Sequence, residues 1–318
     1  MLMIGDIFYI MLFVTTAGGV LTVLSLAASR TLRFMPPLWF SICRMAAYII
    51  PLPAPGLYLI SPEEHSWVHG YDNVCILWLW GILFFTLYDA ARTLLARRAI
   101  RNYRVCDDER IKEICARCVG FAGMKKMPSI YFGTLADPAC AAGVLHPAVI
   151  LNEAAMGQLT DMELTAVLSH EVMHLKRKHI IWGRVYDYIC ILNWMNPLVW
   201  IAKKEFDVEC EIDCDARALA CLEGRLTSAD YANTMLRLLR LSAEQADSQA
   251  EGLHALGFLL AKRRIELMIH KPAKVRKMMI VFVLAILLAL TILFSLSLSR
   301  GHFFPYPAYQ GAPEYYCT

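Results

Sequence analysis

The sequence predicts a multi-pass α-helical membrane protein of about four spans, with a mainly α-helical, α+β domain on its cytoplasmic side. Three observations predict this class. The chain of 318 residues is 58% hydrophobic and has a mean hydropathy of +0.45, whereas soluble domains are usually roughly 45–50% apolar. Its apolar residues form long blocks with few or no charges, and its cations cluster at the ends of those blocks.

Four apolar blocks are long enough to cross roughly 30 Å of hydrocarbon as helices. They are residues 7–29, 36–62, 73–96 and 278–299. The first block lacks the positive start of a cleaved signal peptide and is followed at once by more apolar sequence, so we expect it to stay as a span. Residues 1–96 therefore hold three predicted spans, and the fourth follows the more polar segment 97–277.

The distribution of positive charge predicts how the spans are oriented. Cations follow the first span at Arg30 and Arg33, follow the third between Arg92 and Arg104, and precede the fourth between Lys271 and Lys277. The loop between the second and third spans, SPEEHSWVHGYDN, has formal charges of acidic residues only. We therefore expect a cell-membrane protein with both termini outside, a cytoplasmic domain at 97–277 and an extracellular tail at 300–318.

The same cations account for the net charge of +3, so we predict the lipid bilayer as a partner and no direct binding to nucleic acid. The eleven cysteines are scattered through the spans and the cytoplasmic segment alike, which indicates reduced thiols rather than disulfides. His65 and His69 lie four positions apart in the outer loop, but no motif places a third ligand beside them, so we interpret them as solvated residues.

The cytoplasmic segment is long enough for one compact domain. Residues 107–126 have the apolar spacing of an amphipathic helix, and Cys115 and Cys118 lie on its apolar stripe, so we expect buried thiols there. Two short apolar runs bounded by Gly and Pro follow, and they predict strands at about 129–133 and 144–151.

A second helix carries the stretch SHEVMHLKRKH. Thr160 and Glu163 have the spacing of a capping box, which predicts the start of this helix. Residues 188–202 come later, are uncharged, and are too short to cross a membrane. They form either part of the domain core or a segment that lies against the membrane.

Within the capped helix, His170 and His174 are four positions apart, so their imidazoles share one face and can converge on one metal ion. Glu171 projects from the adjacent position, where a carboxylate can reach a water bound to that ion. This is the H-E-x-x-H arrangement of zinc peptidases.

A catalytic zinc site needs a third protein ligand and an open fourth position. The acidic run EFDVECEIDCD, residues 205–215, supplies the candidates. Two pairs of carboxylates are one helical turn apart, Glu211 with Asp215 and Glu205 with Glu209. In either pair one carboxylate can bind the metal while the other supports a ligand histidine, and spacing alone leaves both pairs open.

The run ILNWMNPLVWIAKKEFDVECEIDCDARAL resembles the signature of the membrane zinc metallopeptidases of the BlaR/MecR type, the antirepressor and β-lactam sensor-transducer family. In that family an aromatic-x-N-P-x-x-W segment follows H-E-x-x-H, and an E-x-x-C-D motif comes next. The matching positions are Trp194, Asn196, Pro197, Trp200, Glu211, Cys214 and Asp215. The likeness also covers WFSICRMAAYIIP, GVLHPAVIL, YANTML and RRIELMI, so it extends over most of the chain up to the fourth span.

The resemblance implies a gluzincin-like zinc peptidase domain that holds one Zn²⁺ per chain. It implies His170, His174 and Glu211 as the metal ligands and Asp215 as the carboxylate that supports a ligand histidine. Glu171 would act as general base and then as proton donor to the leaving amine.

The same resemblance implies that substrate binds in an extended form along an edge strand. The strand predicted for this role is 143–151, and it begins with Gly143, Val144, Leu145 and His146. The sequence does not fix the group that stabilises the oxyanion. The candidates are Arg184, Tyr186, Tyr231 and His254.

Two features depart from the family pattern. His179 stands five positions after His174, where the relatives usually have an aspartate. It either assists the site or, as we expect, faces solvent or caps a helix. The β-lactam sensors continue after the fourth span into a large extracellular penicillin-binding domain, whereas this sequence has the short tail 300–318. We therefore expect no direct β-lactam sensing by a domain of this chain.

Charged residues inside the predicted spans are candidates for a function. Arg44 and Asp89 lie at a similar depth, about 10 Å from the cytoplasmic side by helical rise, which predicts an ion pair between the second and third spans. The alternative is that Arg44 extends its side chain to the cytoplasmic interface.

The leading hypothesis is a membrane zinc metalloendopeptidase that cleaves a cytoplasmic regulatory protein such as a transcriptional repressor, or itself, in signal transduction, alone or as a homodimer. The run ELTAVLSHE also resembles membrane quality-control proteases of the prenyl-protease and heat-shock type, although the N-P-x-x-W segment and Cys214 favour the first family. A third hypothesis is a zinc-bound sensor scaffold that does not cleave. The intact base Glu171 argues against it.

Overall fold

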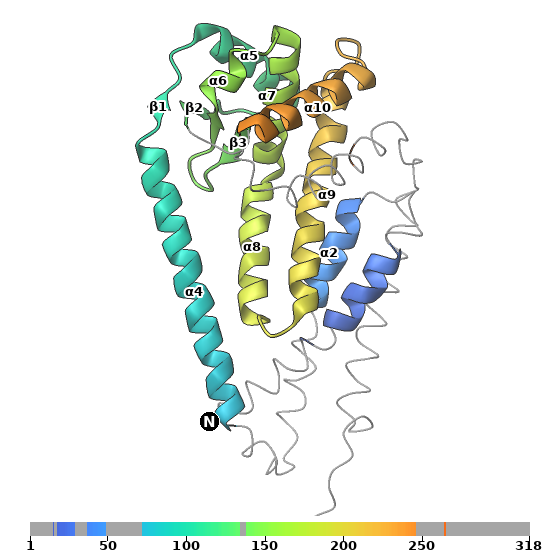
Figure 1. The fold of residues 1–318 in the computed structure, drawn as a ribbon. Helices are drawn as coiled ribbons and strands as arrows, with labels where there is room; N and C mark the ends of the chain where they lie inside the picture. The colour runs from blue at the N-terminus through green and yellow to red at the C-terminus, as the bar shows by residue number, and fades with distance from the viewer. Residues whose placement is uncertain are drawn as a thin grey trace, which may run out of the picture.

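The computed structural model describes residues 15, 18–28, 37–48, 72–133, 138–245 and 264. Its helices are α2 (Pro37–Ala47), α4 (Asp72–Arg101), α5 (Glu109–Ala122), α6 (Glu153–Met156), α7 (Asp161–Arg177), α8 (His179–Leu192), α9 (Pro197–Cys221) and α10 (Ser228–Gln245). Its strands are β1 (Arg104–Val105), β2 (Ser129–Phe132), β3 (Ala139–Ala142) and β4 (Ala148–Leu151). The sheet lies with α5, α6, α7 and α10 at one end of the molecule, and α2, α4, α8 and α9 run away from that end (Figure 1). We call the first part the upper body and the second part the stem.

Among the described residues, one helix is long and apolar enough to cross a membrane, and it covers Ile76–Arg101 of α4. It falls on the third predicted span, 73–96. A shorter apolar helix, Gly18–Ala28, falls on the first. The second predicted span is described only over 37–48, and the fourth span and the tail lie outside the described residues. The count of four spans and their orientation stay predictions.

The sheet has the order β1-β2-β4-β3, so β3 forms one edge. β4 pairs in parallel with β2 and antiparallel with β3, and all four residues of β4 are buried. The predicted strand at 129–133 is confirmed as β2. β3 was not predicted, because alanine and cysteine do not give the β-branched and aromatic signal on which strand prediction depends.

The prediction of a strand over residues 143–151 is wrong in its first half. Gly143, Val144, Leu145 and His146 lie in the connection between β3 and β4. Gly143 has a φ of +82°, a left-handed conformation that favours glycine and turns the chain. Leu145 is 83% exposed, so the apolar run that suggested a strand is largely a surface turn.

The core of the upper body lies between α5, α7 and the sheet. Cys115 and Cys118 are buried on α5, as predicted from their spacing. Thr160 and Glu163 form the predicted capping box, in which the Thr160 hydroxyl accepts from the Glu163 N–H and the Glu163 carboxylate accepts from the Thr160 N–H. This cap fixes where α7 begins, and hence which residues of α7 face the interior.

The stem continues directly from α7. Lys178, with a φ of +57°, is the only residue between α7 and α8, and it caps both helices. α8 and α9 form a hairpin whose tip is 193–196, and Asn196 caps α9 by accepting from the Leu198 N–H at 2.9 Å. Within the stem, α8 contacts α4, and α9 contacts α2. The uncharged run 188–202 is therefore the end of this hairpin, outside the core of the upper body.

Candidate metal centre

The first part of the site lies on one face of α7. The Nε2 atoms of His170 and His174 are 3.1 Å apart, and both rings lie largely inside the protein. Helical spacing accounts for this approach, because residues four positions apart stand above one another on a helix. The sequence prediction that the two imidazoles share a face agrees with this placement.

The second part comes from α9, which packs across α7. The Glu211 carboxylate lies 3.2 Å from His170 Nε2 and 3.3 Å from His174 Nε2. Glu209 points elsewhere, to Arg44 in α2. Of the two carboxylate pairs left open by spacing, the structure brings Glu211 and Asp215 to the histidines.

The three donor atoms fit a zinc ion. A tetrahedral zinc with bonds of 2.0–2.1 Å to nitrogen or oxygen holds its ligand atoms roughly 3.3 Å apart. The observed separations among His170, His174 and Glu211 are 3.1, 3.2 and 3.3 Å. Two imidazoles and one carboxylate also form the ligand set of a catalytic zinc that keeps a fourth position for water.

Asp215 lies on the opposite edge of the His170 ring from Nε2, the nitrogen that faces His174 and Glu211. Its Oδ1 is 2.9 Å from His170 Nδ1, and the Tyr231 hydroxyl donates to the same oxygen at 3.1 Å. A carboxylate at Nδ1 holds the proton on that nitrogen and leaves Nε2 free as a ligand. Tyr231 was one candidate for the oxyanion group, and its hydroxyl lies in this orienting network.

Arg264 is a site residue that sequence reasoning missed. Its Nε and Nη2 donate to the two Asp215 carboxylate oxygens at 2.7 and 2.9 Å, and its Nη1 lies 3.2 Å from Glu211 Oε2. The guanidinium therefore binds Asp215 in a bidentate arrangement and links it to Glu211. The run RRIELMI signalled family likeness, but no spacing rule connects residue 264 with α9.

The charges of this network shift several pKa values. Burial disfavours the charged form of His170, but the carboxylates of Asp215 and Glu211 outweigh burial and raise its pKa to about 10 in the metal-free site. Burial would raise the pKa of Glu211, yet its hydrogen bonds to His170 and His174 and the charge of Arg264 hold it well below its usual range. A metal ion therefore meets an ionised carboxylate and competes with a proton on His170.

Glu171 is buried beside His170, His174 and Glu211 and faces β3. Burial raises the pKa of its carboxyl group, and the backbone of Ala141 in β3 donates a hydrogen bond to it. A carboxylate with a raised pKa can take a proton and later give it back. The edge strand beside Glu171 is therefore β3, whereas the family resemblance had suggested residues 143–151 as the edge strand that binds substrate.

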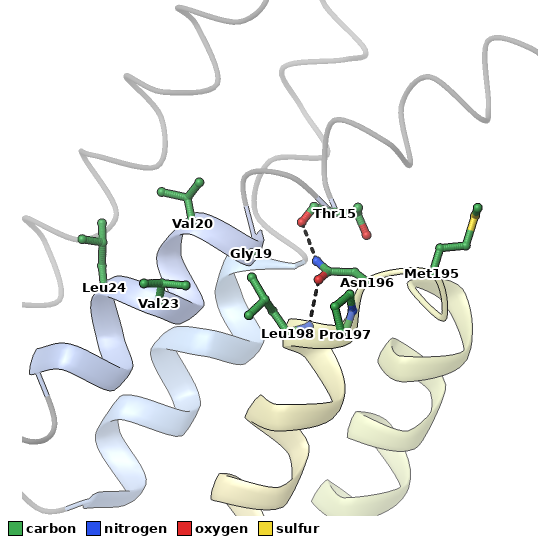
Figure 2. Close-up of a pocket in the computed structure, with 9 residues that line it drawn as sticks. All are labelled: Thr15, Gly19, Val20, Val23, Leu24, Met195, Asn196, Pro197 and Leu198. Carbon is green, nitrogen blue, oxygen red and sulfur yellow. Dashed lines mark hydrogen bonds between the residues drawn. The ribbon is translucent and has the colours of Figure 1, made fainter.

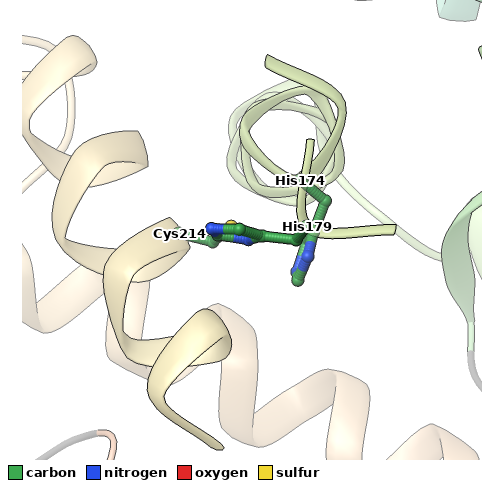
Figure 3. Close-up of side chains that lie close together, drawn as sticks. All are labelled: His174, His179 and Cys214. Carbon is green, nitrogen blue, oxygen red and sulfur yellow. The ribbon is translucent and has the colours of Figure 1, made fainter. Parts of the chain in front are cut away.

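His179 is a correction to the sequence prediction, which expected a solvent-facing or capping histidine. It is the first residue of α8 and is only 6% exposed, with its Nδ1 3.3 Å from Cys214 Sγ. Burial lowers its pKa to about 4. Figure 3 shows His179 and Cys214 beside His174, and donor atoms of these three residues lie within 4.8 Å of one another. This second group shares His174 with the first, so it is not an independent site.

The predicted ion pair between Arg44 and Asp89 is wrong. Arg44 Nη2 lies 2.9 Å from Glu209 Oε1, and Asp89 pairs with Arg184 at 2.6 Å. Depth along the chain was a poor guide because the stem contains α8 and α9, whose charges were not counted as partners.

The remaining candidates for the oxyanion group do not gather at the metal ligands. Arg184 is held by Asp89, and Tyr186 is fully buried in the stem against Phe206. His254 lies outside the described residues. Apart from Tyr231, the described candidates therefore belong to the packing of the stem.

The fold and the site together define a class of protein, namely a helical H-E-x-x-H protein in which a carboxylate from a second helix, Glu211, lies against the two histidines. The comparisons make this specific. A family model described as BlaR1 peptidase M56 matches residues 60–268. This match spans more than half of the chain, so the chain belongs to that family, which confirms the resemblance seen in the sequence.

Curated relatives carry the same family names. The regulatory protein BlaR1 of Bacillus licheniformis is 24% identical over 189 residues, which cover 59% of this chain and 31% of BlaR1. The methicillin resistance mecR1 protein of Staphylococcus aureus strain Mu50 is 24% identical over 187 residues, which cover 58% of this chain and 31% of mecR1. The chain thus matches less than a third of the length of these relatives.

Proposed function

We propose that the chain is a membrane-bound zinc metalloendopeptidase that acts in signal transduction, with one Zn²⁺ held by His170, His174 and Glu211. The observation that carries the proposal is the convergence of these three donors from α7 and α9, with the buried Glu171 next to them. When bound, the ion would polarise a scissile carbonyl and acidify a water molecule.

The chain's own residues would supply the proton transfers and the alignment. Glu171 takes a proton from the attacking water and passes it to the leaving amine, a role that its raised pKa supports. Asp215 keeps the His170 tautomer that exposes Nε2, and Arg264 holds Asp215 and Glu211 in place.

The substrate would bind to β3. This strand is the sheet edge beside α7, and Ala141 within it contacts Glu171. An extended peptide can pair with such an edge through main-chain hydrogen bonds. The proposed substrate strand is therefore Ala139–Ala142 rather than Gly143–His146, and residues 143–146 form the turn at its end.

The substrate class that we favour is a cytoplasmic regulatory protein, such as a repressor, or the chain itself. The relatives are named as a regulatory protein and a resistance protein, which supports a regulatory target over the general turnover expected of a quality-control protease. The complete set of ligands and base supports cleavage over a scaffold role.

The test compares cells that express wild type, Glu171→Gln and Glu223→Gln, with protein termini mapped by mass spectrometry and metal content measured on the purified chain. Glu223 is exposed just after α9 and serves as a control for loss of a carboxylate. We expect Glu171→Gln to keep its zinc and lose specific new termini, while Glu223→Gln matches wild type. Identical termini in all three, with zinc retained, would refute the peptidase function.

A further inference from the structure

The stem contains a layer of ion pairs, and two of its segments beyond that layer carry no charge. Arg184 of α8 pairs with Asp89 of α4, and Lys203 of α9 lies 3.6 Å from Asp187. Beyond this layer, residues 73–88 of α4 and residues 188–202 of the hairpin contain no Asp, Glu, Lys, Arg or His. In α4 and in the hairpin, which are far apart in the sequence, the uncharged segments therefore begin at the same level of the stem. This is expected where a protein enters hydrocarbon.

Polar groups at the tip of the hairpin are satisfied inside the protein. The Trp78 indole donates to the Leu192 carbonyl at 3.1 Å, and the Trp194 indole donates to the Trp78 carbonyl at 3.2 Å. The Trp200 indole donates to the Trp194 carbonyl, also at 3.2 Å. Internal partners for these three indole N–H groups are what an environment without water requires.

The amides at the tip follow the same rule. The Asn193 side chain donates to the Ile189 carbonyl at 2.9 Å and accepts from the Thr15 hydroxyl. Asn196 donates to the Thr15 carbonyl at 2.9 Å and accepts from the Leu198 N–H. These bonds join the tip to residue 15, which lies within the first predicted span.

The outer face of the hairpin is apolar and uncovered in the described part of the chain. Tyr188, Leu192, Met195, Trp200 and Ile201 are 37–55% exposed. On α4, the candidate span, the side chains at the same level are equally uncovered, among them Leu77, Trp80, Leu83, Phe84 and Leu87. The two faces form one apolar surface below the layer of ion pairs.

A groove of about 560 Å³ continues this surface around the tip. It is lined by Gly19, Val20, Val23 and Leu24 of one helix and by Met195 and Leu198 at the hairpin tip (Figure 2). Its lining is almost entirely apolar, which suits a hydrocarbon chain and gives water few partners.

The length of α4 between Trp78 and Asp89 indicates how deeply the tip of the α8–α9 hairpin would reach into a bilayer. Trp78, which meets the tip, precedes Asp89 by eleven residues of α4. Eleven residues of helix rise about 16 Å, which is roughly half of the 30 Å thickness of a hydrocarbon core. A hairpin that bonds to Trp78 thus ends near the middle of the bilayer and returns on the same side.

From these observations we infer that α8 and the first part of α9 form a re-entrant hairpin immersed in the bilayer. Its outer face is a lipid-contact surface, and acyl chains cover Tyr188, Leu192, Met195 and Ile201. The inference rests on the membrane location within the proposed function but requires no catalysis. The peptidase ligand Glu211 then lies on a helix whose beginning is embedded in lipid.

The test places nitroxide labels on the full chain in bilayers of phosphatidylcholine and phosphatidylglycerol. An azide-bearing unnatural amino acid carries the label, so the eleven native cysteines stay untouched. The labelled positions are Tyr188 and Met195 in the hairpin, Leu83 on α4 as a reference, and Met162 on α7 as a control. Met162 is 52% exposed, close to the 55% of Tyr188. Collisions with oxygen, which concentrates in lipid, are compared with collisions with a water-soluble nickel chelate.

We expect oxygen collisions to dominate at residues 83, 188 and 195, with the largest oxygen-to-nickel ratio at 195, and nickel collisions to dominate at 162. Nickel collisions at 188 and 195 with oxygen collisions at 83 would overturn the hairpin insertion alone. Nickel collisions at 83 as well would overturn the membrane location. Low collision rates with both reagents at 188 and 195 would mean that protein, such as a second copy of the chain, covers the face, and would also overturn the inference.

Discussion

Two acidic residues of α9 stand two positions apart and belong to opposite kinds of ionic cluster. Glu209 faces α2, where Arg44 and Ser41 bind it and where neither member of the ion pair has any exposed side chain. Glu211 faces α7, where two histidines and Arg264 surround a carboxylate that stays 37% exposed. A closed pair can only hold helices together, whereas an open cluster with several donors can bind a ligand. The following predictions test this division.

The largest effect is expected from Glu211→Ala. Loss of one of three donors should release the metal, and cleavage should fall by at least the roughly 10²–10⁴-fold expected when a general base is lost. Metal content and product termini measure this. The fold should persist, because Glu211 is partly exposed. A variant that keeps its full metal content and activity would assign Glu211 to packing.

Arg44→Met should lower the free energy of unfolding rather than the metal content. It leaves the buried Glu209 carboxylate without its cation, and removing one partner of a buried ion pair costs roughly 3–5 kcal/mol. Denaturant unfolding in detergent measures the loss.

The double variant Arg44→Met with Glu209→Leu is the matched control, because replacing both partners by apolar residues is often neutral. It should recover most of the stability and bind metal as wild type does. Failure to recover would show that the pair does more than join α2 to α9.

A smaller effect is expected from Asp215→Asn, which keeps the shape of the side chain but removes the charge that orients His170. Metal affinity should fall about 10–100-fold, as is usual for an outer partner of a ligand histidine. Competition with a chromophoric chelator measures it. An unchanged affinity would assign Asp215 to an ion pair with Arg264 only.

The last prediction concerns the pH dependence of metal binding, with the smallest change expected within one pH unit. Because the pKa of His170 is raised to about 10 in the metal-free site, that site is protonated at neutral pH and metal binding releases the proton. Metal affinity should therefore fall as pH falls, by about tenfold per pH unit between pH 6 and 8. In the Asp215→Asn variant this dependence should weaken, because one of the charges that raise the pKa is gone. Equal slopes in both proteins would contradict the coupling.

The sequence predicted those site residues that lie close together along the chain. His170, Glu171 and His174 lie within one helix, so helical periodicity alone places them together. Family likeness singled out Glu211 and Asp215, whereas spacing could not separate them from Glu205 and Glu209.

What the sequence did not predict depends on contacts between distant elements. Arg264 reaches α9 from far along the chain, and the partner of Arg44 is on α9 rather than on the next predicted span. β3 was missed because its alanine-rich run has weak strand preference, while a glycine turn at 143 imitated the start of a strand. Helices defined by spacing were easier to predict than their partners in space.

The junction at Lys178 couples movements of the stem to the helix that carries His170 and His174. One residue joins the helix that carries His170 and His174 to α8, and the chain has no loop there to absorb a change of direction. A sideways displacement of α8 therefore acts as a lever on the end of α7, with the elbow four residues beyond His174. Lengthening the elbow by a few glycines would disconnect the lever while leaving every ligand in the sequence.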